Sequence, residues 1–184
     1  SPAKPAEFTL ALRIPQWSKT TTAKLISGSD TLNISLDNLP AGEYAKVDRK
    51  WKTGDCIELS LDLTPHLLEL NGHQAVVRGP IVLARDSRFN DGFVDECVVI
   101  QSSEDGSVAL TPAEGNDFAW MSFTAPMVAG ADLEGNGKPR QIHLCDFASA
   151  GNTWDKSTRY KVWLPKTLNV TKGEYRAYND APHN

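Results

Sequence analysis

The stretch Phe8-Thr-Leu-Ala-Leu-Arg-Ile-Pro15 decides the fold class of this chain. Its larger apolar side chains recur at every second position, at Phe8, Leu10, Leu12 and Ile14. This period of two predicts a β-strand with one apolar face turned inward, which ends at Pro15. Residues 57–63 repeat the alternation and stop at Thr64-Pro65. Two half-buried strands are therefore expected in the first third of the chain.

Short runs of the same kind continue to the end of the sequence, with glycine, asparagine and aspartate between them. The further predicted strands are Ala23–Ser27, Thr31–Leu36, Glu43–Arg49, Ala75–Arg85, Glu96–Gln101, Ser107–Leu110, Phe118–Thr124, Gln141–Cys145 and Arg159–Leu164. No window keeps a helical period long enough to predict a helix. The pattern is typical of an all-β chain, an antiparallel β-sandwich of jelly-roll or immunoglobulin-like type.

The chain length allows one large domain or two small ones, since it has 184 residues. Apolar strands give way to polar turn residues at Ser87–Gly92, which predicts a boundary there. We expect a linker or excision scar at 1–7, a first sandwich subdomain at 8–88, and a second at 89–184 that ends in a polar tail. The opening residues lack the apolar segment of a signal peptide.

Composition and charge exclude several partners. The formal net charge is −4, from 23 acidic and 19 basic residues, so no broad cationic surface is available for phosphate backbones. Nucleic acid is therefore not an expected partner. No apolar stretch approaches the roughly 20 residues of a membrane span, so no membrane partner is expected either.

The residues themselves indicate no catalytic, cofactor or metal site. Three cysteines, Cys56, Cys97 and Cys145, form no CxxC pair, and we interpret them as buried free thiols. None of the four histidines joins a serine and an acid in a nucleophile motif. His143 alternates with apolar neighbours and is expected at the surface or an interface. No cofactor is predicted.

The segment Asp146–Asp155 is the most unusual loop, because it mixes small residues with two aromatics, two acids and an amide. In a carbohydrate-binding interpretation, Trp154 is a stacking platform, and Asn152 and Asp155 accept hydrogen bonds from sugar hydroxyls. Asp146, at the start of the loop, is a further candidate contact to a carbohydrate or to another domain. In the alternative interpretation, Trp154 packs over the end of the sandwich or onto a neighbouring domain. Both interpretations stay open.

Four segments carry a family resemblance. Phe8–Trp17 resembles the strand that follows the catalytic barrel in glycoside hydrolase family 127, which includes β-L-arabinofuranosidases and was formerly a family of unknown function. Tyr44–Asp55, Val77–Ala84 and Tyr160–Pro165 resemble later segments of that family, in the same order. The first 85 residues match well, whereas Asn90–Pro139 do not.

The resemblance implies the C-terminal β-sandwich region of such an enzyme. In the family, a helical (α/α)6 barrel upstream of this region carries a zinc-bound cysteine nucleophile and an assisting glutamate. Cys56, Cys97 and Cys145 do not match those clustered ligands, so no catalytic residue is carried over. The implied partners are the enzyme's own N-terminal barrel and plant polysaccharide, and the implied location is periplasmic or extracellular.

Three functions follow from these observations. The first is a non-catalytic accessory region, in which Arg78, beside the bend of Gly79-Pro80, pairs with a carboxylate across an interdomain contact. The second is an autonomous carbohydrate-binding module with an exposed Trp154, Trp120 or Trp17. The third, a self-contained enzyme, is disfavoured because no nucleophile or metal constellation is present. Trp51 and Trp163 are expected in the core.

Overall fold

A computed structural model describes residues 2–36, 41–129, 139–153 and 155–166. Within these ranges almost every regular element is a β-strand, and every pair of neighbouring strands is antiparallel. The one helical element described is a single 3-10 turn, η1 (Ser87–Phe89). No helix in the described ranges is long and apolar enough to cross a membrane. The predicted all-β, sandwich-like fold is confirmed.

The chain divides into two compact units, unit 1 (Ser1–Leu63) and unit 2 (Thr64–Asn184). This division differs from the boundary expected near Ser87–Gly92, which lies inside unit 2. The physical reason is strand pairing, because β7 (His73–Arg78) and β8 (Ile81–Asp86) belong to the same sheet as the strands that follow them. The polar turn residues after β8 begin a loop of unit 2.

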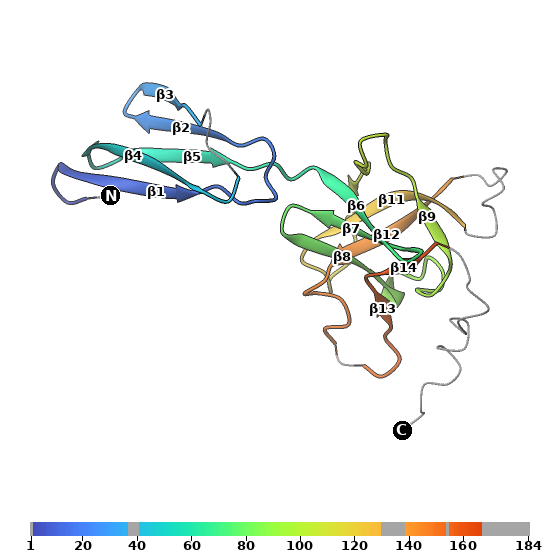
Figure 1. The fold of residues 1–184 in the computed structure, drawn as a ribbon. Helices are drawn as coiled ribbons and strands as arrows, with labels where there is room; N and C mark the ends of the chain where they lie inside the picture. Colours follow the sequence, from blue (N-terminus) through green and yellow to red (C-terminus); the bar gives the residue numbers. More distant parts are fainter. Residues whose placement is uncertain (1, 37–40, 130–138, 154, 167–184) are drawn as a thin grey trace. The chain divides into compact units, whose positions relative to one another are not determined.

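Unit 1 consists of two small antiparallel sheets (Figure 1). One pairs β1 (Ala6–Arg13) with β4 (Tyr44–Trp51), and the other has the order β3 (Asp30–Ile34), β2 (Thr22–Ser27), β5 (Cys56–Ser60). The buried apolar residues come from both sheets and from the residue after β1; they are Ile14, Ala23, Leu25, Ala45 and Trp51. Buried faces on both sheets are what a sandwich requires.

The predicted alternation holds in unit 1, with one exception. Leu10 and Leu12 are half-buried and Ile14 is buried, but 45% of Phe8 is exposed. The ring of Phe8 stacks on Trp51 with 5.7 Å between centroids, and the Trp51 indole donates a hydrogen bond to the Phe8 carbonyl. Trp51 is 4% exposed, as the sequence predicts for a core residue.

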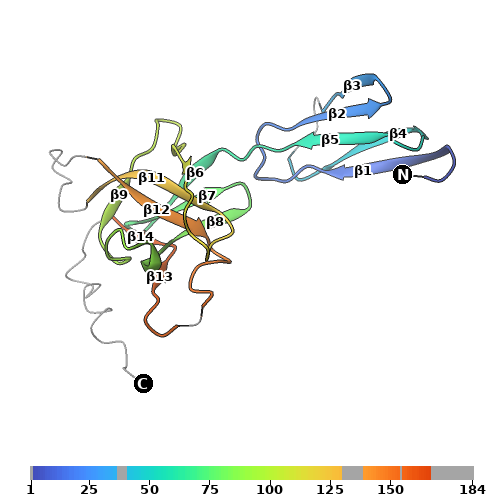
Figure 2. The same cartoon turned by 180° about the vertical axis from the view of Figure 1, so that it is seen from behind.

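Unit 2 is a nine-stranded antiparallel sheet (Figures 1 and 2). Its main path has the order β10-β11-β12-β8-β7-β14, while β6 pairs with β7, β9 with β11, and β13 with β8. The strands not yet placed are β6 (Pro65–Leu70), β9 (Val98–Ile100), β10 (Thr111–Pro112), β11 (Ser122–Ala129), β12 (Arg140–Asp146), β13 (Tyr160–Lys161) and β14 (Leu164–Pro165).

The predicted strand Ala75–Arg85 is in fact a hairpin. Arg78 pairs with Ile81, so Gly79 and Pro80 form a two-residue turn between β7 and β8. Gly79 has φ +59°, which glycine at the first turn position adopts without steric cost. The bend expected at Gly79-Pro80 is this hairpin turn, and it divides the single predicted strand into two.

Three other predictions need correction. The predicted strand 57–63 ends earlier, at Ser60, and Pro65 begins the next strand, β6. The predicted strand Ser107–Leu110 has isolated bridges at Ser107 and Val108, and it precedes β10. Cys56 is exposed and Cys97 half-buried, whereas Cys145 is buried, and none of the three forms a disulfide.

The core of unit 2 is built from the inner face of this sheet. Its buried cluster comprises Val76, Leu83, Val98, Ile100, Val108, Ala125, Met127, Ile142, Leu144 and Leu164. One amide lies fully buried in unit 2, since Gln74 of β7 is 0% exposed. The Gln74 side chain donates to the Val98 carbonyl and accepts from the Ile100 N–H at 3.2 Å. It therefore ties β9 to β7 across the core.

Candidate functional site

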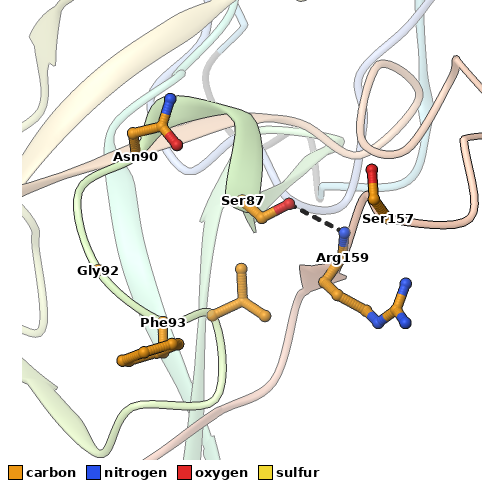
Figure 3. Close-up of a pocket in the computed structure, with 7 residues that line it drawn as sticks. Ser87, Asn90, Gly92, Phe93, Ser157 and Arg159 are labelled. Atoms are coloured by element: carbon orange, nitrogen blue, oxygen red, sulfur yellow. Dashed lines mark hydrogen bonds between the residues drawn. The ribbon is translucent and has the colours of Figure 1, made fainter.

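A pocket of about 390 Å³ lies in unit 2 between the segment after β8 and the segment before β13 (Figure 3). Its lining residues are Ser87, Asn90, Gly92, Phe93, Val94, Ser157 and Arg159. The Phe93 side chain is 75% exposed, whereas Val94 is 5% exposed. The pocket therefore combines an accessible aromatic ring, a buried aliphatic residue and several polar groups.

Two hydrogen bonds between Ser87 and Arg159 hold the two walls of the pocket together. The Ser87 N–H donates to the Arg159 carbonyl at 2.8 Å, and the Arg159 N–H donates to Ser87 Oγ at 2.9 Å (Figure 3). These bonds continue the β8–β13 ladder by one residue pair beyond Asp86 and Tyr160. Because Oγ is the acceptor, the Ser87 hydroxyl proton stays available to a ligand.

Asn90 and Ser157 present acceptor atoms at the pocket. Asn90 Nδ2 donates to the Arg88 carbonyl at 3.3 Å, and Asn90 Oδ1 has no partner among the described residues. Ser157 Oγ donates to Asp155 Oδ1 at 2.9 Å, so the oxygen lone pairs of Ser157 remain free to accept.

The backbone at Asn90 and Gly92 shapes the first wall. Asn90 has φ +54° and caps η1, a left-handed conformation that asparagine tolerates well. Gly92 has φ +128°, and a Cβ there would lie 2.7 Å from Arg85 Nη2 and 2.9 Å from Glu96 Oε2. Only glycine fits at this position without displacing a charged group.

A buried arginine lies behind Gly92. The Arg85 side chain is 0% exposed, and its Nη2 lies 3.5 Å from Asp91 Oδ1 and 3.2 Å from Glu96 Oε2. Glu96 also pairs with Arg140. Arg85 Nε and Nη1 are buried without a hydrogen-bond partner. Arg85 thus fastens the 91–96 segment to the sheet.

Asp86 and Arg88 form a second internal ion pair at the end of β8. Asp86 accepts hydrogen bonds from the Arg88 N–H, Nε and Nη2 at 2.7–2.9 Å, and from the Gly151 N–H at 2.9 Å. Burial opposes ionisation of Asp86, but the hydrogen bonds outweigh it and hold its pKa below the ordinary value. The bond to Asp86 likewise raises the pKa of Arg88.

Cys145 lies near the carboxylates of Asp86 and Asp146. Burial raises the pKa of Cys145 to about 12, and the charges of Asp86 and Asp146 add to the effect. The thiol therefore stays protonated at neutral pH, which agrees with the predicted inert core cysteine and not with a nucleophile.

We expect Asp86→Asn to lower the free energy of unfolding at neutral pH by about 1–3 kcal/mol, because several bonds to a charged group are lost. The folded-state pKa of Asp86 is depressed, so the carboxylate stabilises the fold above its ordinary pKa of 3.8, and this contribution disappears as the pH falls through the folded value. Urea unfolding over the acid range should therefore show the gap between the two proteins shrinking as the pH falls.

The control for this experiment is Asp30→Asn, at an exposed carboxylate of β3. It should change the free energy of unfolding by less than about 0.5 kcal/mol at every pH. A gap between wild type and Asp86→Asn that stays constant down to acid pH would contradict the ionised pair.

Of the predicted site residues, Asp146 is internal. It is 6% exposed, and its carboxylate accepts the Met121 N–H at 2.9 Å, the Ser149 N–H at 3.0 Å and the Ser149 hydroxyl. Ser149 Oγ in turn accepts the Trp120 N–H at 2.9 Å. Asp146 therefore fixes the start of its own loop and the neighbouring turn.

The side-chain amide of Asn152 is also hydrogen-bonded within unit 2. Its Oδ1 accepts Arg88 Nη1 at 2.8 Å, and its Nδ2 donates to the Phe118 carbonyl at 3.0 Å. The Arg88 guanidinium lies 3.9 Å from the centre of the Phe118 ring and donates to the Ser149 carbonyl. The structure thus joins the Asp146 and Asn152 parts of the loop through Arg88 and Ser149.

Of the other three predicted residues, Asp155 and Arg78 lie apart from this network. Asp155 accepts the Ser157 N–H at 2.8 Å and the Ser157 hydroxyl, and these bonds lower the pKa of Asp155. It therefore positions a pocket residue. Arg78 lies over the Phe123 ring, 5.6 Å from its centroid. Trp154 lies outside the described residues.

Exposed aromatic side chains occur in the Asp146–Asp155 loop and near it. Trp120 is 90% exposed, Phe147 50% and Tyr160 49%, with 6.0 Å between the ring centroids of Phe147 and Tyr160. Trp163 is 39% exposed, so its predicted core position is wrong. His143 is half-buried and stacks on Phe89 at 5.0 Å.

The pocket was not predicted from the sequence, because the turn residues at Ser87–Gly92 indicated a boundary between domains. The sequence signals for a shaped loop were Asn90 and Gly92, which both have positive φ. Asn90 caps η1, and Gly92 lies too close to Arg85 for a Cβ. In the described part of the chain, no group of three or more histidine, cysteine, aspartate or glutamate side chains is placed to hold a metal ion.

Comparison with known proteins gives two findings. Residues 1–63 match the family model described as the β-L-arabinofuranosidase GH127 middle domain. A solved structure titled "Glycoside hydrolase" has the same fold over 92% of this chain, with a TM-score of 0.63 and 24% sequence identity. No curated protein matches.

The chain spans 29% of the length of that solved structure. The matched family model is that of the middle domain, so the finer assignment to the C-terminal region stays a prediction. Residues 1–63 are thus similar to the middle domain of glycoside hydrolase family 127, and the chain has a fold found within a larger glycoside hydrolase.

Proposed function

We propose that this chain is a non-catalytic accessory β-region of a family-127-type glycoside hydrolase. The observation that carries the proposal is the match of residues 1–63 to the family's middle domain. The polar groups that the sequence offered as a site support it, because Asp146 and Asn152 bond to neighbouring loops of unit 2. Such side chains hold a scaffold in shape.

In this proposal the partner is the helical catalytic barrel of the same enzyme, in a periplasmic or extracellular protein. Arg78 is a candidate contact, because its guanidinium rests on Phe123 and its described contacts leave its charge without a carboxylate. A cation held over a ring retains donors for a carboxylate on another domain.

Assay of the purified chain against aryl arabinofuranosides and other aryl glycosides tests the proposal. We expect no turnover above a boiled control. Turnover that one point substitution in this chain abolishes would overturn the non-catalytic assignment. In the longer enzyme, Arg78→Ala should lower the melting temperature or the activity, whereas Lys24→Ala, on an exposed part of β2, should change neither.

A second candidate function is autonomous carbohydrate binding. The specific observation is Trp120, which is 90% exposed on a turn whose backbone is held by Ser149. An exposed indole on a turn whose backbone is hydrogen-bonded is a suitable stacking surface for a sugar ring. Calorimetric titration with soluble plant polysaccharides, beside Trp120→Ala and Trp154→Ala, tests this function. Unchanged affinity in both variants would count against the loop.

A further inference from the structure

We propose that the pocket beside Phe93 binds one neutral sugar residue of a glycan. This inference rests on the carbohydrate-binding candidate and names a site for it other than the Asp146–Asp155 loop. It is independent of the accessory role, which can hold whether or not the pocket binds sugar.

The apolar part of the pocket suits the carbon-bound hydrogens of a sugar. Phe93 is 75% exposed, so its ring contributes little to the core and presents a face to a ligand. Val94 next to it is buried, which fixes the backbone that carries the ring. Aromatic side chains beside a small number of placed polar groups are the usual composition of ligand pockets.

The polar part offers donors and acceptors in one place. The Ser87 hydroxyl has a proton to donate, while Asn90 Oδ1 and Ser157 Oγ have lone pairs to accept. Figure 3 shows Ser87 and Asn90 on one wall and Ser157 on the other. A sugar hydroxyl both donates and accepts, so adjacent hydroxyls can satisfy this mixed set.

The charges nearby favour a neutral ligand. Among the described residues of the lining, Arg159 is the one with a charge, and its Nη1 donates to the Lys156 and Thr158 carbonyls. Its side chain runs away from Phe93 (Figure 3). Arg85 behind Gly92 is already paired with two carboxylates. In the described part of the lining, no cation is therefore directed toward Phe93 to select an acidic sugar or a phosphate.

The walls are held before any ligand arrives. The Ser87–Arg159 bonds join the two segments, Asp155 holds Ser157, and Gly92 is packed against Arg85. Ordering of loops is a major cost of binding, and here it is small. A pocket of about 390 Å³ is near the lower end for small-molecule sites, which suits one sugar ring and not an extended chain.

Amide NMR titration of the chain tests the proposal, with L-arabinose, D-xylose, D-galactose and arabinotriose as probes. We expect shifts for residues 87–94 and 157–159 at millimolar ligand. Phe93→Ala should weaken binding about tenfold, which corresponds to a loss of about 1.4 kcal/mol of stacking. Asn90→Gly keeps the left-handed backbone and removes the amide, and should weaken binding at least about threefold.

Leu70→Ala is the matched control, because it removes a 57% exposed apolar side chain from β6, outside the pocket lining, and should leave the affinity unchanged. Amide spectra of each variant confirm folding. Shifts confined to the Asp146–Asp155 loop and lost in Trp120→Ala would overturn the pocket and keep carbohydrate binding. Tighter binding of galacturonate than galactose would overturn the neutral ligand. No shift with any sugar would overturn the site and leave the accessory role standing.

Discussion

Gly92→Ala is expected to lower the free energy of unfolding of unit 2 by about 3 kcal/mol. At φ +128° the backbone is in a region that costs an L-residue about 1–3 kcal/mol. The added methyl would also lie 2.7 Å from Arg85 Nη2. Arg85 cannot withdraw, because its side chain is fully buried and paired with Asp91 and Glu96. Urea denaturation followed by circular dichroism measures the loss.

Gly106→Ala provides the matched comparison. Gly106 also has positive φ, at +79°, but a Cβ there would meet no atom within 4 Å. Its cost should therefore be the conformational part alone, about 1 kcal/mol. Equal losses in the two variants would mean that Arg85 does not restrict the space at Gly92. Gly92→Ala should also weaken sugar binding, because the pocket wall must move.

Gln74→Leu is expected to cost about 3 kcal/mol. The Gln74 amide is 0% exposed and satisfies the Val98 carbonyl and the Ile100 N–H of β9. Leucine fills a similar space but leaves both backbone groups buried without partners, and each such group costs about 1–3 kcal/mol. The three-residue strand β9 has few other bonds to β7, so we expect it to loosen first.

Hydrogen exchange gives this prediction a local readout. In Gln74→Leu the Ile100 amide should exchange faster by a larger factor than amides of β12. Gln141→Leu, at an exposed glutamine of β12, is the control and should change stability by less than about 0.5 kcal/mol. A Gln74→Leu protein as stable as wild type, with Ile100 still protected, would show that the amide is dispensable.

The alternating apolar pattern was sufficient to predict the strands of unit 1 and the all-β class, because a half-buried strand places every second side chain in the core. It was insufficient where strands are buried on both faces. Ala75–Val77 and Ile81–Ala84 are apolar throughout, so no alternation separates them, and the dipeptide Gly79-Pro80 is the turn signal between them. The interior charge at Arg85 was unpredictable, since its partners Asp91 and Glu96 occur in a segment that resembles a linker.

The candidate site was not predicted from the sequence for a different reason. We predicted carbohydrate or interdomain contacts at three polar residues near Trp154, namely Asp146, Asn152 and Asp155. Their hydrogen bonds go instead to backbone and side-chain groups of unit 2. A sequence does not show whether a polar atom is already satisfied. The pocket joins two segments that are distant in the chain, and only the pairing of β8 with β13 brings them together.

The pairing of Ser87 with Arg159 has an evolutionary consequence. The bonds that hold the walls use backbone groups and one serine, whereas Phe93 and Ser157 project from loops outside the strands. Mutations at those two positions would leave strand register untouched. After gene duplication, copies of this chain could therefore diverge in what they recognise while inheriting the same framework.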